Sequence, residues 1–280
     1  MTLAGGPLVT AAVDAALRAA VARGEAGVRC SLDLGRSEVD VAVDADGFTV
    51  AGARYPFVAP CREHTVYGWD GREFQPLARR SRALVKLVPT DWGPPTFEID
   101  GVKMLPTATV SPWADAAAKV ALVRPRGRRV LDTCGGLGYF AAACLAASAA
   151  QVRSFEVNPD VRWLRERNPW SPEGPGSGVD RERLVLEEGD IAACIAGLPD
   201  AGFDAVLHDP PRFALAGELY SLAFYRELAR VLRRGGRLFH YTGAPNARSR
   251  GRDLPGEVLR RLGEAGFRAS RALDGVLATR

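Results

Sequence analysis

The sequence lacks the residue patterns that mark metal centres, disulfide frameworks and membrane proteins. Its cysteines are few and contain no Cys-x-x-Cys pair: Cys30, Cys61, Cys134, Cys144 and Cys194. An odd number of unpaired cysteines excludes neither packing nor reactivity, but it argues against a disulfide framework or a zinc site, so we predict no metal. No apolar run reaches membrane-spanning length, and residues 1–21 lack the basic start of a signal peptide. We therefore expect a cytoplasmic protein with no membrane contact.

Charge of one sign does not dominate either. The 280 residues include 37 Lys and Arg against 33 Asp and Glu, which gives a net charge of +4. This mildly basic balance permits a nucleic-acid partner without requiring one. The length allows one large domain or two ordinary ones, and the 47% hydrophobic content is that of a globular chain.

The first hundred residues predict a small β-rich domain with one leading helix. Apolar residues recur every fourth position from Val9 to Val21, as on one face of a helix that Gly24 ends. Residues 39–43 alternate apolar and polar, and further short strands are expected around 48–50, 64–69, 83–88 and 96–99. We predict that residues 1–105 form an accessory domain that selects the substrate.

From residue 106 onward, the pattern predicts an α/β domain that reaches residue 280. Strand-like runs at 130–132, 151–157, 183–186, 203–208 and 236–241 alternate with helical stretches at 139–147, 159–167, 191–198 and 222–232. Such alternation favours a parallel sheet covered on both faces. Two final runs flank Asp274-Gly275, which is a hairpin signal, so the sheet should end in an antiparallel hairpin.

Glycines and carboxylates follow the predicted strands of this domain. The first strand leads into a glycine loop, where the backbone can approach a ligand closely. Glu156 ends the second strand, about twenty residues later, where a carboxylate can accept both ribose hydroxyls. Asp190 ends the third strand near an expected adenine amino group, and Asp209 follows the fourth. Because open α/β sheets bind ligands at the carboxyl ends of their strands, we expect one site there.

At these residues the chain resembles the class I S-adenosylmethionine-dependent methyltransferases, whose Rossmann-like, seven-stranded sheet ends in an antiparallel hairpin. The resemblance implies S-adenosylmethionine as cofactor, with the ribose on Glu156 and the adenine near Asp190. It implies that Asp132, Gly136 and Gly138 hold the methionine end, and Cys134 and Gly135 of the same loop are further predicted cofactor-binding residues. Cys134 departs from the commonest pattern, which has glycine there. Asp-Thr-Cys-x-Gly-Leu-Gly-Tyr and Asn168-Pro-Trp-Ser171 also resemble a group of predicted archaeal-type methyltransferases.

A glycine loop alone would also fit a tight turn in any α/β protein, including one that binds nicotinamide cofactors. The Asp209-Pro210-Pro211 sequence after the fourth strand favours the methyltransferase interpretation, because it resembles the Asp/Asn-Pro-Pro-aromatic motif of amino-group methyltransferases. In that motif the acidic or amide side chain orients the amine, and the aromatic residue stacks on a flat base. Here Arg212 takes the aromatic position and Phe213 follows. The alternative is that Asp209 only caps its loop.

Further residues near the strand ends are candidates for contact with the substrate. His208 and His240 end neighbouring strands and could accept the proton of the amine, or could be hydrogen-bonded structural residues. The predicted substrate contacts are Pro210, Pro211, Arg212, Phe213, Tyr220, Tyr241, Arg248, Arg250 and Arg252. The last three arginines could meet phosphates or form a solvated loop. A second basic cluster comprises Arg79, Arg80, Arg82 and Lys86.

The sequence therefore predicts an N-methyltransferase, with RNA (tRNA or rRNA) as the first choice of acceptor and a small-molecule amine as the alternative. A rival chemistry comes from residues 216–225, which are similar to the segment after the catalytic aspartate of spermidine synthases. Those enzymes transfer an aminopropyl group. A third interpretation is a non-catalytic module that binds S-adenosylmethionine.

Overall fold

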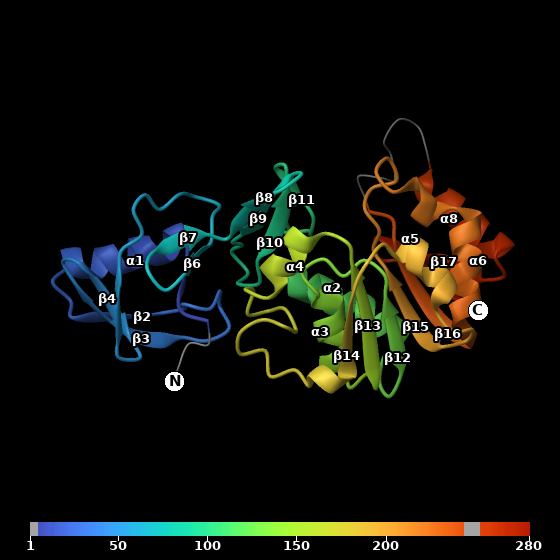
Figure 1. The fold of residues 1–280 in the computed structure, drawn as a ribbon, viewed down its shortest axis with the longest axis horizontal. Helices are drawn as coiled ribbons and strands as arrows, with labels where there is room; N and C mark the ends of the chain where they lie inside the picture. Colours follow the sequence, from blue (N-terminus) through green and yellow to red (C-terminus); the bar gives the residue numbers. More distant parts are fainter. Residues whose placement is uncertain (1–4, 244–252) are drawn as a thin grey trace. The chain divides into compact units, whose positions relative to one another are not determined.

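The computed structural model describes residues 5–243 and 253–280 (Figure 1). The chain divides into two compact units. Unit 1 comprises residues 1–114 and 160–178, and unit 2 comprises residues 115–159 and 179–280. The chain therefore leaves unit 1, begins unit 2, returns to unit 1 for nineteen residues and then completes unit 2.

A mostly parallel seven-stranded sheet forms the centre of unit 2. Its strand order is β14-β13-β12-β15-β16-β18-β17. The first five strands in this order pair in parallel, whereas β18 is antiparallel to both β16 and β17. The strands are β12 (Arg129–Asp132), β13 (Gln151–Glu156), β14 (Leu184–Glu188), β15 (Phe203–His208), β16 (Leu232–Tyr241), β17 (Arg268–Ala272) and β18 (Gly275–Thr279). The expected mixed α/β architecture with a mostly parallel central sheet is confirmed.

Helices cover both faces of this sheet. In Figure 1, α3 lies on one face, and α5, α6 and α8 lie on the other. The larger apolar core fills the space under the second group, where Val206 and Leu238 of the sheet meet Leu228 and Val258 of the helices. The helices are α2 (Pro112–Val123), α3 (Tyr139–Ala146), α5 (Ile191–Cys194), α6 (Leu222–Val231), α8 (Leu254–Glu264) and the short 3-10 turns η1 (Arg181–Arg183), η2 (Ile195–Gly197) and η3 (Gly217–Tyr220).

Unit 1 contains one long helix and three small antiparallel sheets. Helix α1 (Ala11–Ala22) begins at Thr10, whose side chain accepts a hydrogen bond from the Val13 amide at 3.3 Å. The sheets are β1-β6-β7, β2-β3-β4-β5 and β11-β10-β9-β8. Their strands are β1 (Leu8–Val9), β2 (Gly27–Cys30), β3 (Val39–Asp44), β4 (Gly47–Val50), β5 (Ala53–Pro56), β6 (Tyr67–Trp69), β7 (Phe74–Pro76), β8 (Ala78–Arg80), β9 (Leu84–Val88), β10 (Thr96–Ile99) and β11 (Val102–Lys103).

Residues 160–178 join unit 1 through specific contacts with its N-terminal part. This segment holds most of α4 (Pro159–Arg165). The Trp170 indole nitrogen donates to the Leu34 carbonyl at 2.8 Å, and the Ser81 hydroxyl donates to the Asp160 carboxylate at 2.5 Å. These part-buried hydrogen bonds tie the segment to unit 1.

Across the part of the chain that the structure describes, no helix is both long enough and apolar enough to cross a membrane.

Candidate active site

The glycine loop after β12 has the backbone geometry that its sequence predicts. Gly136 and Gly138 have φ values of +51° and +79°, in the left-handed region that glycine adopts without a steric penalty. The Gly135 amide donates to the Phe155 carbonyl at 2.7 Å, which holds the loop against the end of β13. Gly138 then caps α3. The loop therefore sits at the carboxyl end of the sheet, with the first turn of a helix beside it.

Glu156 lies against this loop from the end of β13. One carboxylate oxygen accepts from the Gly136 amide at 2.8 Å, and the other accepts from the Asn158 amide at 2.8 Å. A carboxylate with both oxygens on backbone amides has a fixed direction. Glu156 is thus brought together with the glycine loop, as expected for a pair of ligand-binding elements.

The other predicted cofactor residues lie at the same edge of the sheet. Asp132 is buried at the end of β12 and accepts from the Ser154 hydroxyl at 2.8 Å. Asp190 is exposed after β14 and accepts from the Ala192 amide at 2.8 Å, so it also caps α5. Burial raises the pKa of the Cys134 thiol well above its ordinary value, which keeps this side chain uncharged.

Asp209 follows β15 and is half-buried. Burial raises the pKa of its carboxyl to about 7, Lys119 lowers it, and the neighbouring carboxylates Asp115, Asp132 and Asp274 raise it further. Within the residues that the structure describes, no hydrogen bond or ion pair reaches this carboxyl. It is therefore both available to a substrate and able to change protonation state near neutral pH.

Lys119 is a buried lysine beside Asp209 that was not predicted from the sequence. Its ammonium lies 2.6 Å from a carboxylate oxygen of Asp115, 3.0 Å from one of Asp274 and 4.4 Å from the centroid of the Tyr241 ring. Only 2% of the Lys119 side chain is exposed. We call Asp115, Lys119, Tyr241 and Asp274 the Lys119 cluster. The four-residue spacing of Asp115 and Lys119 in a predicted helix was the one available signal.

Asp274 reaches the cluster because the terminal hairpin is tied to the end of β16. Its main-chain carbonyl accepts from the amides of Thr242 and Gly243, at 3.3 and 3.0 Å. The hairpin turn that the sequence predicted therefore also supplies a charged side chain to the site, which the sequence analysis did not foresee.

The two histidines are neighbours, as expected, but they point into the core. His208 pairs with His240 in the sheet, and their ring centroids are 4.4 Å apart. The His208 ring bonds to the Thr133 hydroxyl at 2.7 Å and the Leu219 carbonyl at 3.0 Å. The His240 ring bonds to the Tyr225 hydroxyl and the Tyr241 carbonyl, both at 2.8 Å.

Each imidazole thus uses one nitrogen as donor and the other as acceptor. Burial lowers the pKa of His208 to about 4 and that of His240 well below its ordinary value. This arrangement argues against the predicted proton acceptors, because neither ring has a nitrogen free to take a proton. Side chains alternate along a strand, so His240 faces the core while Tyr241 faces the Lys119 cluster.

The predicted substrate contacts after β15 form a folded loop. The Tyr220 hydroxyl donates to the Pro211 carbonyl at 3.0 Å, and the Phe213 ring meets the Tyr220 ring edge-on with centroids 5.4 Å apart. Tyr220 is fully buried, so in this structure it supports the loop. Pro210 is buried, whereas Pro211 and Arg212 are exposed. Arg248, Arg250 and Arg252 lie outside the described residues.

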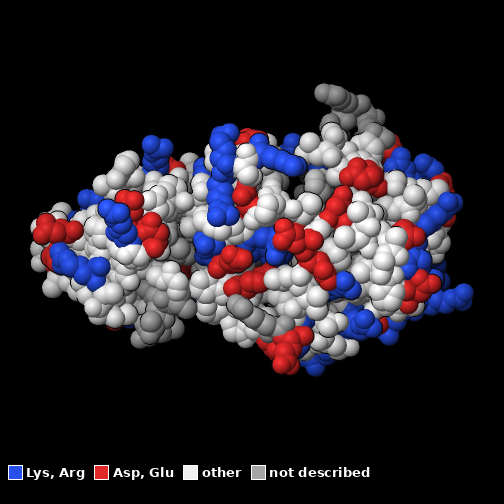
Figure 2. All heavy atoms as spheres, viewed as in Figure 1, with Lys and Arg blue, Asp and Glu red and all other residues white. Residues whose placement is uncertain are grey.

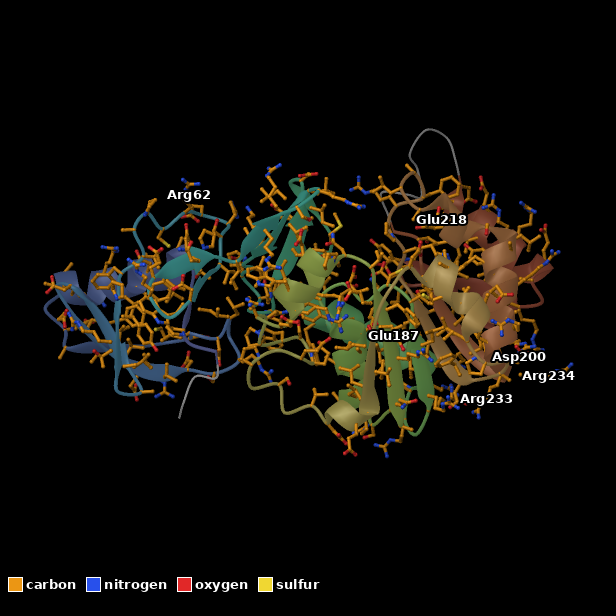
Figure 3. The ribbon with its side chains drawn as sticks, in the orientation of Figure 1. Arg62, Glu187, Asp200, Glu218, Arg233 and Arg234 are labelled. Atoms are coloured by element: carbon orange, nitrogen blue, oxygen red, sulfur yellow. The ribbon has the colours of Figure 1, made fainter. Side chains whose placement is uncertain are left out.

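The opposite end of the sheet carries its own charged residues. Figure 3 shows Asp200, Arg233 and Arg234 grouped where β15 and β16 begin, whereas Glu218 lies nearer the other end. Asp200 pairs with Arg230 at 2.5 Å, and Arg233 pairs with Asp204 at 2.8 Å. These pairs lie far along the strands from the glycine loop. Among the described residues, no group of His, Cys, Asp or Glu could hold a metal ion.

No family model matches the chain. In fold it is similar to a spermidine synthase in complex with the transition-state analogue AdoDATO, with 17% identity, a TM-score of 0.57 and coverage of 72% of this chain and 71% of that chain. It is also similar to MNMC2 of Aquifex aeolicus, with 20% identity, a TM-score of 0.52 and coverage of 72% of each chain. At this level of identity the likeness shows a shared fold.

The sequence is 43% identical over 211 residues to a protein of Methanocaldococcus jannaschii that carries the name Uncharacterized protein MJ1233. The alignment covers 75% of this chain and 70% of that protein. The chain therefore belongs to the same family as MJ1233.

Proposed function

We propose that this protein is a transferase that uses S-adenosylmethionine to methylate an amine nitrogen, with RNA as the acceptor. The proposal depends mainly on Asp209, which follows the C-terminal end of β15. Its side-chain carboxyl has a pKa of about 7 and is available to a substrate. A carboxylate there can accept a hydrogen bond from an amine and stabilise the positive charge that develops on its nitrogen.

The residues at the strand ends fit the cofactor. Gly136 and Gly138 have positive φ and no side chain, so the loop backbone can come close to a ligand at these two positions. A carboxylate has about four acceptor sites, so Glu156 can accept from ribose hydroxyls while the loop amides hold its direction, and Asp190 can accept from an adenine amino group. When bound, S-adenosylmethionine supplies an electrophilic methyl group on its sulfonium.

Asp209 positions the acceptor and takes its proton. On transfer the nitrogen would gain the methyl group that the cofactor's sulfonium gives up, and the proton of the amine would pass to the Asp209 carboxylate. The lysine of the Lys119 cluster lowers the pKa of that carboxyl and so opposes the effect of burial, which favours the charged form that accepts the proton. In this proposal His208 and His240 hold the strand ends in place.

The support for RNA comes mainly from unit 1. Arg79, Arg80 and Arg82 are exposed in unit 1, and exposed arginines can meet phosphates. We propose that residues 1–105 select the acceptor, and that Arg248, Arg250 and Arg252 contact its phosphates. A small-molecule amine is the alternative acceptor.

Transfer of labelled methyl groups tests the chemistry directly. Wild-type protein should transfer label to RNA, Asp209→Asn should be slower, and Asp209→Ala slower still, with cofactor affinity nearly unchanged. Full turnover by Asp209→Ala would show that Asp209 only caps its loop. Cofactor binding with no transfer to RNA or to any amine would favour the non-catalytic module. Mass spectrometry of modified nucleosides, with and without the protein in cells, would identify the acceptor.

Aminopropyl transfer is the second candidate, and two observations favour it. Residues 216–225 are similar to the matching segment of spermidine synthases, and a spermidine synthase shares the fold with a TM-score of 0.57. The two chemistries differ in the cofactor that they require. Calorimetry that shows tighter binding of decarboxylated S-adenosylmethionine than of S-adenosylmethionine would decide for aminopropyl transfer.

A further inference from the structure

Unit 1 contains a cavity of about 930 Å³ that the proposed methyl transfer does not use. Its volume is typical of pockets that hold small organic ligands. Apolar side chains such as Leu8 and Leu77 form part of the lining, and three arginines, Arg36, Arg79 and Arg167, form another part. A pocket that combines apolar surface with several guanidinium groups suits an anionic ligand that also has a flat, apolar portion.

Two of these arginines lie around one indole ring. The guanidinium carbons of Arg79 and Arg167 are 4.6 and 4.2 Å from the centroid of the Trp163 ring. Arg167 has a partial counter-ion in Glu166, at 3.3 Å. Arg79 has no carboxylate partner within the residues that the structure describes. Two guanidiniums held at one ring repel each other, and a bound anion would relieve that repulsion.

Arg36 adds a third cation to the lining and, like Arg79, lacks a carboxylate partner among the described residues. Its guanidinium donates to the Pro169 carbonyl and lies 5.6 Å from the centroid of the Trp170 ring. Its side chain pairs with no carboxylate in the described part of the chain. These contacts fix the direction of the guanidinium but leave its charge without a counter-ion.

Besides Glu166, the lining contains two carboxylates, Asp33 and Asp70, and both are hydrogen-bonded within their own turns. Asp33 accepts from the Ser31 hydroxyl at 2.8 Å and from the amides of Arg36 and Ser37 at 3.0 and 2.9 Å. Asp70 accepts from two backbone amides, each at 2.8 Å. Carboxylates with fixed backbone donors do not turn towards the arginines, so the arginines remain the groups that can meet a ligand.

Positive charge continues outside the cavity along β8. Arg80 and Arg82 are exposed beside Arg79, and Figure 2 shows Lys and Arg side chains grouped over this part of unit 1. Several cations in the same short segment as a cavity arginine fit a chain of phosphates better than they fit a single small anion.

We propose that this cavity binds one nucleotide of a single-stranded RNA. Arg79 and Arg36 hold its phosphate, and its base lies among the apolar residues and the half-buried Trp69 of the lining. This inference rests on the RNA acceptor of the proposed function. It assigns unit 1 a nucleotide-binding site separate from the residues of methyl transfer.

Binding of a fluorescent, short, single-stranded RNA of mixed sequence tests the site. Fluorescence anisotropy with the full chain, at several salt concentrations, should show a salt-dependent affinity. Arg79→Gln should weaken binding about tenfold and reduce the salt slope by about one. The matched control is Arg62→Gln, which removes one exposed charge from unit 1 away from the cavity lining (Figure 3). It should change affinity less than twofold, on the order expected for one distant charge.

Equal losses in the two variants would show general attraction and overturn the site, as would undetectable RNA binding by the wild-type chain. AMP measured in the same way separates the two sources of a nucleotide. If AMP binds and loses affinity in Arg79→Gln while RNA does not, the ligand is a free nucleotide and the RNA assignment is wrong. Cofactor binding, measured on the same samples, reports separately on the transferase proposal, because RNA can bind unit 1 without cofactor.

Discussion

The carboxyl of Asp209 is expected to lower the stability of the folded protein at alkaline pH. Burial raises its pKa from 3.8 to about 7, a shift of about three units. Such a shift corresponds to at most about 4 kcal/mol between the neutral and charged forms. Because the side chain is only half-buried and water screens its charge, we expect about 1–2 kcal/mol. Asp209→Asn removes the charge and keeps the shape.

The sign of the effect follows from the raised pKa. Near pH 4 the folded protein carries a neutral Asp209, and the unfolded chain is only partly ionised, so the penalty is small. As pH rises above the unfolded value of 3.8, the unfolded chain gains a charge that the folded state resists. The penalty reaches its full size above the folded pKa of about 7. Asp209→Asn should therefore be more stable than wild type at pH 8, and this gain in stability should be much smaller at pH 5.

Urea unfolding, followed by tryptophan fluorescence at pH 5 and pH 8, measures this difference. The control is Glu218→Gln, which removes an exposed carboxyl near the same loop (Figure 3) and should give equal, small effects at both pH values. If the gain from Asp209→Asn is the same at both pH values, the Asp209 charge does not resist burial. The account of its protonation near neutral pH would then be wrong.

Three further substitutions test other parts of the site. Glu156→Ala should weaken binding of S-adenosylmethionine by about 1–3 kcal/mol in calorimetry, because ribose hydroxyls lose their acceptor; unchanged affinity would contradict the ribose assignment. Lys119→Met should cost about 3–5 kcal/mol of stability, because two carboxylates lose their counter-ion. It should also raise the pKa of Asp209 and so shift the acid limb of the pH–rate profile to higher pH. An acid limb at an unchanged pH would show that Lys119 does not control the pKa of Asp209. His240→Phe should cost about 1–3 kcal/mol, because the Tyr225 hydroxyl loses its acceptor. A pH–rate profile altered by His240→Phe would restore a catalytic role for this histidine.

The elements of unit 2 could largely be predicted because their signals are local. Strand β15 begins and ends where the apolar run at 203–208 does, and the carboxylates after each strand follow from that placement. Helix α8 was missed, although Leu254, Val258 and Leu262 recur at helical spacing and are buried. Pro255 and Gly256 in its first turn hide the pattern, because proline is tolerated there only at the first helical positions.

The long-range parts of the site could not be predicted. Lys119 and Asp274 meet at 3.0 Å although 155 residues separate them, and no sequence pattern links the two. The sequence places both histidines at the correct strand ends. Side chains alternate between the two faces of a strand, and only the packing of η3 and α6 shows which face is the core. The fold thus sets the pKa values of the site residues in a way that the spacing of residues in the sequence cannot reveal.

The return of residues 160–178 to unit 1 has a consequence for how the protein is made. The N-terminal part of unit 1 leaves the ribosome first, but its partners Trp170 and Asp160 follow only after the start of unit 2 has been synthesised. Unit 1 therefore cannot complete its folding as an independent N-terminal domain would. A chain cut between the two halves should leave Leu34 and Ser81 without their hydrogen-bond partners. Genetic separation of the two units therefore requires transplanting this segment, since no single cut preserves both.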